Sequence, residues 1–265
     1  MKVSAIQCRI GDMKSAEKTA LSAIEKGAEI LLFPEYFSYA ELSLTISEKT
    51  IDFLKRISRE FKVVAVGNVV YKAETIYNRA VVFDNGDAVA YQDKIHPTKT
   101  ERVLGISPGK ALNVFSVRKA KFCILVCADI LYPELCRVAG LKGVEVALNP
   151  VVSFKHSDLP GTELRHCLYF ARSFDNCYAI VKAGGFGRTF TGAEVVGRSL
   201  IASFDGILAK SKREDCEEAI VSELDLERIR EYRKRNYSLT DRNVDAYHEL
   251  LNVSKRDFNS SQIGL

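Results

Sequence analysis

The chain has 265 residues, of which 47% are hydrophobic and 27% charged, with a formal net charge of +4. These values exclude a disordered, collagen-like or low-complexity chain. The charge is too small to indicate nucleic-acid binding, and the longest apolar run (residues 122–128) is far shorter than the ~18 residues that span a bilayer. We therefore expect no nucleic-acid partner, no membrane span and, from the first residues, no signal peptide.

The cysteine count indicates the redox environment. The seven cysteines are an odd number, and nothing in the sequence suggests export. Reduced thiols and a cytoplasmic location are therefore expected rather than a disulfide framework. No Cys-x-x-Cys occurs, and the histidines show no metal-ligand spacing, so no metal site is expected.

The first third of the chain alternates predicted strands and helices. Asp12 can cap a helix that ends at Gly27. Ser47 can open a second helix, because apolar residues recur at helical spacing as far as Phe61. The predicted order is a strand (3–10), a helix (12–27), a strand (30–33), a helix (47–61) and a strand (62–71).

Two hairpins mark the rest of the chain. Asn85-Gly86 and Asp205-Gly206 lie between β-type segments, and such pairs tolerate the positive φ angles of tight hairpin turns. The other predicted elements are strands at 121–127, 144–149 and 178–183, helices at about 133–141, 160–176 and 226–236, and a last segment near 245–251.

Each half thus repeats strand, helix, strand and hairpin. This repetition predicts an α/β protein in which two sheets pack face to face with helices outside. No linker composition divides the chain. We therefore expect one domain over residues 1–265, with a catalytic core of about residues 1–250 and a C-terminal tail at 251–265.

Three strand ends carry reactive side chains. Layered α/β folds place functional groups at the carboxyl ends of strands, and here these are Glu35, Lys94 and Cys127. A thiol is mostly protonated at neutral pH and needs a base, such as a carboxylate in a dry pocket. A lysine and a backbone N–H, such as that of Ala128, would stabilise the oxyanion that forms after thiol attack. Together they would support acyl transfer.

Each of these residues also has a plainer interpretation. A cysteine ending an apolar strand is usually a small core residue, and a lysine is usually exposed. A glutamate after a proline can simply cap the next segment. Spacing alone leaves these alternatives open.

Three motifs favour the catalytic interpretation. FPEYF, YQDKIHP and CILVCADILYPEL resemble, in order, the glutamate, lysine and nucleophile motifs of the nitrilase superfamily of carbon–nitrogen hydrolases. The likeness covers about residues 1–250. It implies Glu35 as the base, Lys94 as the lysine, and Cys127 rather than Cys123 as the nucleophile. It also implies a four-layer α-β-β-α sandwich of two mixed sheets, a homodimer or higher homo-oligomer, and no cofactor.

The sequence departs from the family pattern in two places. Ala128 is small where many members carry an aromatic residue, which would reshape the pocket. The residues after the lysine also differ, so a helper glutamate found in several members falls at Glu101 only with a small gap. Asp129 is expected to fix the nucleophile turn, and Arg137 and Arg172 to pair with buried acids.

The resemblance implies hydrolysis of a C–N bond in a small amide through a thioester, which releases ammonia and a carboxylic acid. Ser153 and Phe154 are expected to shape the pocket and Arg102 to bind substrate. Cations expected near the mouth would suit the monoamide of a short dicarboxylic acid. They are Lys99, Arg102, Lys155 and Arg165.

Several alternatives remain at this stage. Nitrile or N-carbamoyl hydrolysis belongs to the same superfamily, so the substrate is a small-molecule amide or nitrile. A non-catalytic binding scaffold would keep the fold without the reaction. A redox-sensing thiol protein would form a reversible disulfide between Cys127 and either Cys123 or Cys136.

Overall fold

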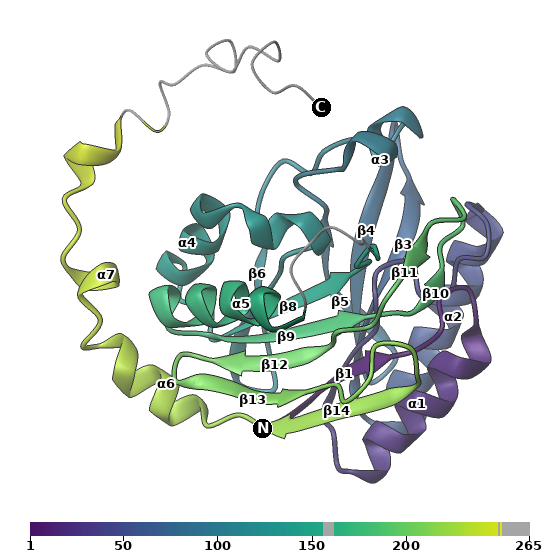
Figure 1. Cartoon of the computed structure of the whole chain (residues 1–265), viewed down its shortest axis with the longest axis horizontal. Coiled ribbons are helices and arrows are strands. Elements are labelled where there is room, and N and C mark those ends of the chain that lie inside the picture. Colours follow the sequence, from purple (N-terminus) through teal and green to yellow (C-terminus); the bar gives the residue numbers. More distant parts are fainter. Residues whose placement is uncertain (156–161, 249, 251–265) are drawn as a thin grey trace.

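In the computed structural model, which describes residues 1–155, 162–248 and 250, two six-stranded sheets pack face to face (Figure 1). The first sheet has the order β14-β1-β2-β3-β4-β5. Its strands are β1 (Lys2–Gln7), β2 (Ile30–Leu32), β3 (Val64–Lys72), β4 (Ile76–Asp84), β5 (Asp87–Asp93) and β14 (Glu218–Glu223). The second has the order β13-β12-β9-β8-β7-β6. Its strands are β6 (Val114–Val117), β7 (Ala120–Ile124), β8 (Val146–Val151), β9 (Ala179–Gly184), β12 (Leu200–Ser203) and β13 (Gly206–Lys210).

The two sheets share one plan. In each, three central strands run parallel, β1-β2-β3 and β7-β8-β9. One antiparallel strand flanks them on one side, and an antiparallel hairpin follows on the other. Asn85-Gly86 forms the turn of hairpin β4–β5. In the corresponding hairpin β12–β13 the turn is Phe204-Asp205, one residue earlier than predicted, and Gly206 begins β13. This correspondence confirms the duplication expected from the sequence.

Helices cover the outer face of each sheet. Helices α1 (Met13–Glu25) and α2 (Leu44–Phe61) pack on the first, and α4 (Pro133–Leu141) and α5 (Thr162–Asn176) on the second. A third apolar cluster lies between the sheets and combines side chains such as Val3 and Leu32 with Phe122 and Val181. The four-layer α-β-β-α prediction is confirmed.

Several predicted boundaries were wrong. The first strand ends at Gln7, and α2 begins at Leu44 because Ser43 caps it, its side chain accepting from the Thr45 amide. Strand β7 ends at Ile124, and Cys127 instead begins a short 3₁₀ helix, η1 (Cys127–Leu131). The predicted start of α5 near residue 160 lies outside the described residues.

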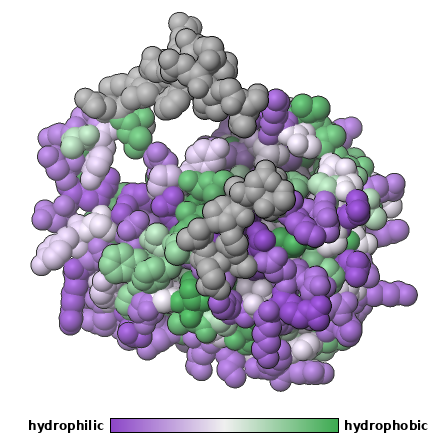
Figure 2. Space-filling model, viewed as in Figure 1, coloured by the Kyte–Doolittle hydropathy of each residue, from purple (hydrophilic) through white to green (hydrophobic). Residues whose placement is uncertain are grey.

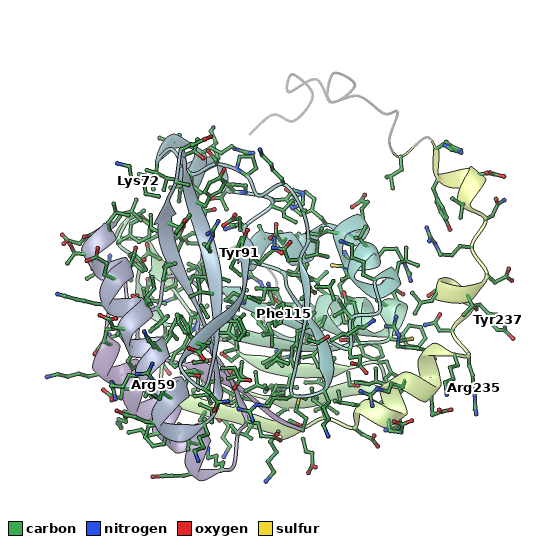
Figure 3. All side chains as sticks on the ribbon, turned by 180° about the vertical axis from the view of Figure 1, so that it is seen from behind. Arg59, Lys72, Tyr91, Phe115, Arg235 and Tyr237 are labelled. Carbon is green, nitrogen blue, oxygen red and sulfur yellow. The ribbon has the colours of Figure 1, made fainter. Side chains whose placement is uncertain are left out.

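The remaining elements are short. They are α3 (Lys99–Val103), β10 (Gly187–Arg188), β11 (Glu194–Val195), α6 (Leu226–Arg233), α7 (Tyr237–Thr240) and η2 (Val244–Tyr247). The C-terminal helix therefore ends at Arg233, three residues before its predicted end. From α6 the chain leaves the sandwich as an arm that carries Arg235 and Tyr237 (Figure 3). No helix within residues 1–155, 162–248 and 250 is long and apolar enough to cross a membrane.

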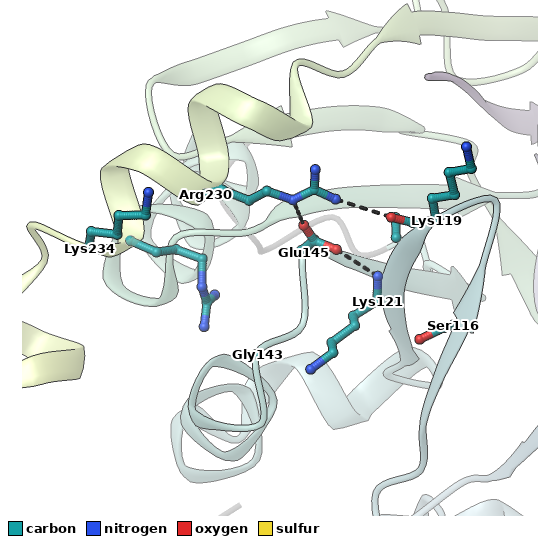
Figure 4. A pocket seen from close by; sticks show the side chains of 9 residues that line it. Ser116, Lys119, Lys121, Gly143, Glu145, Arg230 and Lys234 are labelled. Atoms are coloured by element: carbon teal, nitrogen blue, oxygen red, sulfur yellow. Dashed lines mark hydrogen bonds and ion pairs between the residues drawn. The ribbon is translucent and has the colours of Figure 1, made fainter.

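Helix α6 is fastened to the second sheet by its arginines. Arg230 contacts the Glu145 carboxylate at 2.5 Å and the Lys119 carbonyl at 3.1 Å across a surface pocket (Figure 4). Arg233 donates to main-chain carbonyls that include Gly140 O at 2.6 Å. Because these guanidinium groups are bonded within the fold, they anchor the base of the arm.

Two other arginines differ from expectation. Arg137 donates to the carbonyls of Asp175 and Ser238, and Arg172 donates to the carbonyl of Ile130. The prediction that they pair with buried acids was wrong, since within the described residues their hydrogen bonds go to these carbonyls and to the Ser238 hydroxyl.

Candidate active site

Elements of both sheets bring Glu35, Lys94 and Cys127 to one cavity. Glu35 follows β2, Lys94 follows β5, and Cys127 opens η1 after β7. Glu35 and Lys94 are 2% and 1% exposed. The compartment that all three line has a volume of about 50 Å³, and Glu101 lines it as well.

Lys94 joins two carboxylates. Its Nζ lies 2.8 Å from Glu35 Oε1 and 2.7 Å from Glu101 Oε2. The Asn78 amide donates to both acids, at 2.7 and 2.9 Å, and the Tyr36 hydroxyl donates to Glu101 at 2.9 Å. Each carboxylate therefore has several donors, as burial of these charges requires.

The position of Glu101 follows from local sequence. Thr98 caps α3, its hydroxyl accepting from the Glu101 amide, while the Glu101 carboxylate accepts from the Thr98 amide at 2.8 Å. This capping box turns the carboxylate back towards the strand end. The structure thus brings Glu101 to Lys94, where the helper glutamate was expected.

The two acids differ electrostatically. Burial raises the pKa of Glu35, an effect that the Glu101 charge reinforces and the Lys94 charge opposes. Burial also acts on Glu101, but Lys94 and the Thr98 amide outweigh it, and its pKa is lowered. Acids whose pKa values are pushed apart in this way suit different roles. Glu101 suits a permanent counter-charge, whereas Glu35 suits proton exchange.

The lysine and the thiol are also shifted. Burial lowers the pKa of Lys94, but Glu35, Cys127 and Glu101 outweigh it, so the pKa is raised and the ammonium is retained. Burial raises the pKa of Cys127, and the Glu35 charge raises it further. The thiol is therefore protonated until a base takes its proton.

The nucleophile turn is conformationally unusual. Cys127 has φ +50°, a left-handed value that is rare for a residue with a side chain. The Asp129 carboxylate, fully buried, accepts from the amides of Val126 at 3.1 Å and His96 at 2.8 Å. The Asn149 amide donates to the Cys127 carbonyl at 3.2 Å. These bonds hold the turn against the strand end that carries Lys94, as expected of Asp129.

A wider compartment opens beside Cys127. Its volume is about 400 Å³, and Ala128, Ser153 and Phe154 line it. The expected pocket residues of this loop are thus at the cavity, while residues 156–158 of the same loop lie outside the described part of the chain.

Of the four expected cations, only Arg165 lines this compartment among the described residues. Lys99 and Arg102 are exposed on α3 and line neither compartment, whereas Glu101 on the same helix is buried. Lys155 is exposed and pairs with Glu194 at 3.2 Å. The expected contact of Arg102 with substrate therefore gains no support from its position and stays a prediction.

The family model named Carbon-nitrogen hydrolase matches residues 2–234. The chain belongs to this family. It is a carbon–nitrogen hydrolase of the nitrilase superfamily, as the three motifs implied.

Relatives of this hydrolase include proteins named as a probable hydrolase, a nitrilase and an omega-amidase. It is 28% identical over 258 residues to "Probable hydrolase YhcX" of Bacillus subtilis, covering 85% of this chain and 49% of that protein, so the chain spans about half of it. It is 28% identical over 244 residues to a "Nitrilase" of Pyrococcus abyssi, covering 86% and 87%. It is 23% identical over 246 residues to "Omega-amidase NIT3" of Saccharomyces cerevisiae, covering 84% and 83%.

Solved structures show the same fold. A mutant of the amidase from Nesterenkonia sp. AN1, with acrylamide added to its active-site cysteine, superposes with a TM-score of 0.80 at 22% identity. The match covers 94% of this hydrolase and 99% of that chain.

Several residues of the candidate site were not predicted from the sequence. Tyr36 and Asn78 hold the carboxylates, and Tyr169 and Lys182 line the wider compartment. One signal was available, since Lys182 interrupts the apolar strand AIVKAG, where a charge needs an explanation.

Proposed function

We propose that this hydrolase cleaves small amides with Cys127 as nucleophile, Glu35 as general base and acid, and Lys94 as oxyanion donor. The main support is the arrangement around Lys94, whose buried ammonium lies between the Glu35 and Glu101 carboxylates in the cavity that Cys127 also lines. The pKa of Glu35 is raised and that of Glu101 is lowered. This arrangement supplies the proton acceptor that a protonated thiol needs and a positive charge for the transition state.

In the first half-reaction, the Glu35 carboxylate takes the Cys127 proton as sulfur attacks the carbonyl carbon. The carbonyl electron pair moves to oxygen, where the Lys94 ammonium and the Ala128 N–H receive it. An ammonium has three donors, and two of those of Lys94 are used by Glu35 and Glu101. When the C–N bond breaks, Glu35 returns its proton to nitrogen, and ammonia or an amine leaves a thioester.

In the second half-reaction, Glu35 takes a proton from water as its oxygen adds to the thioester carbonyl. The C–S bond breaks, the sulfur regains the proton and the acid is released. The small compartment beside Glu35 has room for this water, which needs about 10–15 Å³ of the about 50 Å³ present. Glu101 keeps Lys94 in place and charged through both steps.

An amide is the favoured substrate, and one relative is named omega-amidase. Nitriles and N-carbamoyl compounds are the alternatives, because other relatives are named nitrilase and N-carbamoylputrescine amidase. We extend the proposal to the monoamide of a short dicarboxylic acid. Arg165 supports it, as a cation at the wider compartment.

We further propose a homodimer formed through α4 and α5. Large apolar side chains are exposed on these helices, and hydrophobic residues gather over α5 in Figure 2. Water-exposed apolar patches commonly mark contact surfaces. The residues are Val138, Leu141, Phe170 and Phe174, each at least 38% exposed.

Ammonia release from a panel of amides, nitriles and ureido compounds tests the reaction. We expect amides to be hydrolysed, Cys127→Ala to abolish release, and Cys123→Ala, at a fully buried thiol, to retain it. Full activity of Cys127→Ala, or no release from any compound, would contradict the proposal. A reversible disulfide of Cys127, found by mass spectrometry in an inactive protein, would favour the redox alternative.

A further inference from the structure

Lys182 is a buried cation that the proposed mechanism does not use. It lies in β9, where Val181 and Ala183 point into the core between the sheets. Because side chains alternate along a strand, Lys182 points to the opposite side, towards α5. Its side chain lines the wider compartment together with Cys127, although the residue is only 2% exposed.

No carboxylate of the described chain pairs with this ammonium. Among residues 1–155, 162–248 and 250, Lys182 Nζ contacts the ring of Tyr169, 5.1 Å from its centroid. A cation–π contact offsets only part of the several kcal/mol that burial of an unpaired ammonium costs. An aliphatic side chain would fill this strand position at lower cost. The lysine therefore points to an anion that arrives from the cavity.

Arg165 approaches the same space from α5. It lines the compartment, is partly buried, and forms no ion pair with a described residue. Arg198, by contrast, is held by Glu214 at 2.7 Å and does not line the compartment. Two cations without acidic partners in the described part of the chain thus share one wall, and apolar residues such as Leu131 and Val152 line the same compartment.

We propose that Lys182 and Arg165 bind a carboxylate at the far end of the substrate's acyl chain, and that Lys182 is the residue that selects anionic over neutral amides. This inference rests on the amide hydrolysis proposed above. It assigns the selective contact to a residue in the middle of a sheet, whose position is fixed by strand pairing on both sides.

The charge of Lys182 then makes selection dependent on pH. Burial, followed by Arg165 and Arg198, lowers the pKa of Lys182 to about 7, while Cys127 and Glu214 oppose this shift. Tyr169 also faces it. Above that pH the free enzyme loses the ammonium, so kcat/KM for an anionic amide should fall about tenfold per unit relative to a neutral amide.

Succinamate and butyramide test this selection, because they have four carbons each and differ by a terminal carboxylate. In Lys182→Met we expect the ratio of their kcat/KM values to fall about 10- to 100-fold, and its dependence on pH near 7 to disappear. Lys155→Met, which removes an exposed lysine paired with Glu194, is the matched control and should keep the ratio. An equal fall in kcat/KM for both substrates in Lys182→Met would overturn the proposal. A purely structural role of Lys182 would affect both substrates, and so would a contact with the carboxylate that hydrolysis produces next to Cys127.

Succinate binding separates failure of the subsite from failure of the reaction. Calorimetry with wild-type protein at pH 8, in buffers of different ionisation enthalpy, should show proton uptake when succinate binds, and Lys182→Met should lose both binding and uptake. If neither amide is hydrolysed, the proposed reaction fails, while Lys182-dependent succinate binding still supports the subsite. Binding of equal strength to wild type and Lys182→Met would refute it.

Discussion

Replacing Glu101 by glutamine removes one of the two carboxylate charges that contact the Lys94 ammonium, while the shape of the side chain is nearly kept. The substitution abolishes a 2.7 Å charged hydrogen bond between residues that are 5% and 1% exposed. Such bonds contribute about 1.5–3 kcal/mol, so kcat/KM should fall about 10- to 100-fold.

The same change should move the pH profile in a defined direction. The Glu101 charge is one of the causes that raise the pKa of Glu35. Without it, the pKa of Glu35 falls, so the ionised base persists to lower pH. The acidic limb of the kcat/KM profile for a neutral amide should therefore shift to lower pH.

Kinetics of Glu101→Gln between pH 4 and 9, with circular dichroism to confirm folding, measure both effects. Glu194→Gln is the matched control, because it neutralises an exposed glutamate whose partner is Lys155. A folded Glu101→Gln protein with unchanged kcat/KM, or an acidic limb that moves to higher pH, would refute this view of the site.

Three further outcomes are expected. Tyr36→Phe removes one hydrogen bond to Glu101 and should lower kcat/KM about fivefold; an unchanged rate would contradict that role. Arg233→Met leaves four carbonyls, in α4, α5 and the loops that precede β8 and β9, without this donor. It should lower the free energy of unfolding by about 2–3 kcal/mol in urea titrations, with kcat retained. Phe174→Asp, at a residue 48% exposed on α5, should convert the proposed dimer to monomer in sedimentation runs. A monomeric wild type, or a dimer that persists in the variant, would exclude this interface.

The three residues that we propose as catalytic could be located from the sequence because each follows a strand with its own local signal. Glu35 follows a short apolar strand and a proline, Lys94 follows a hairpin, and Cys127 follows another apolar strand. Packing of the two sheets then brings these strand ends to one cavity. Glu101 was also within reach, because Thr98 and Glu101 have the spacing of a capping box.

Other features depend on tertiary packing and were not predictable from local pattern. Arg102 was expected at the cavity, but the direction of α3 is set by the cap and turns it to solvent. Lys182 appeared only as a charge within an apolar strand, and the side of the sheet it occupies depends on register. The left-handed turn at Cys127 is held by hydrogen bonds that the Asp129 carboxylate accepts from the amides of Ile95 and His96, which follow β5.

Intact-mass measurement of the acyl-enzyme tests the central claim most directly. Rapid acid quenching during turnover of a short amide should give a protein heavier by the acyl group, and peptide mapping should locate that mass on Cys127. Hydroxylamine should release it, as expected of a thioester. An acyl adduct on any other residue, or turnover by a Cys127→Ala protein, would contradict the account.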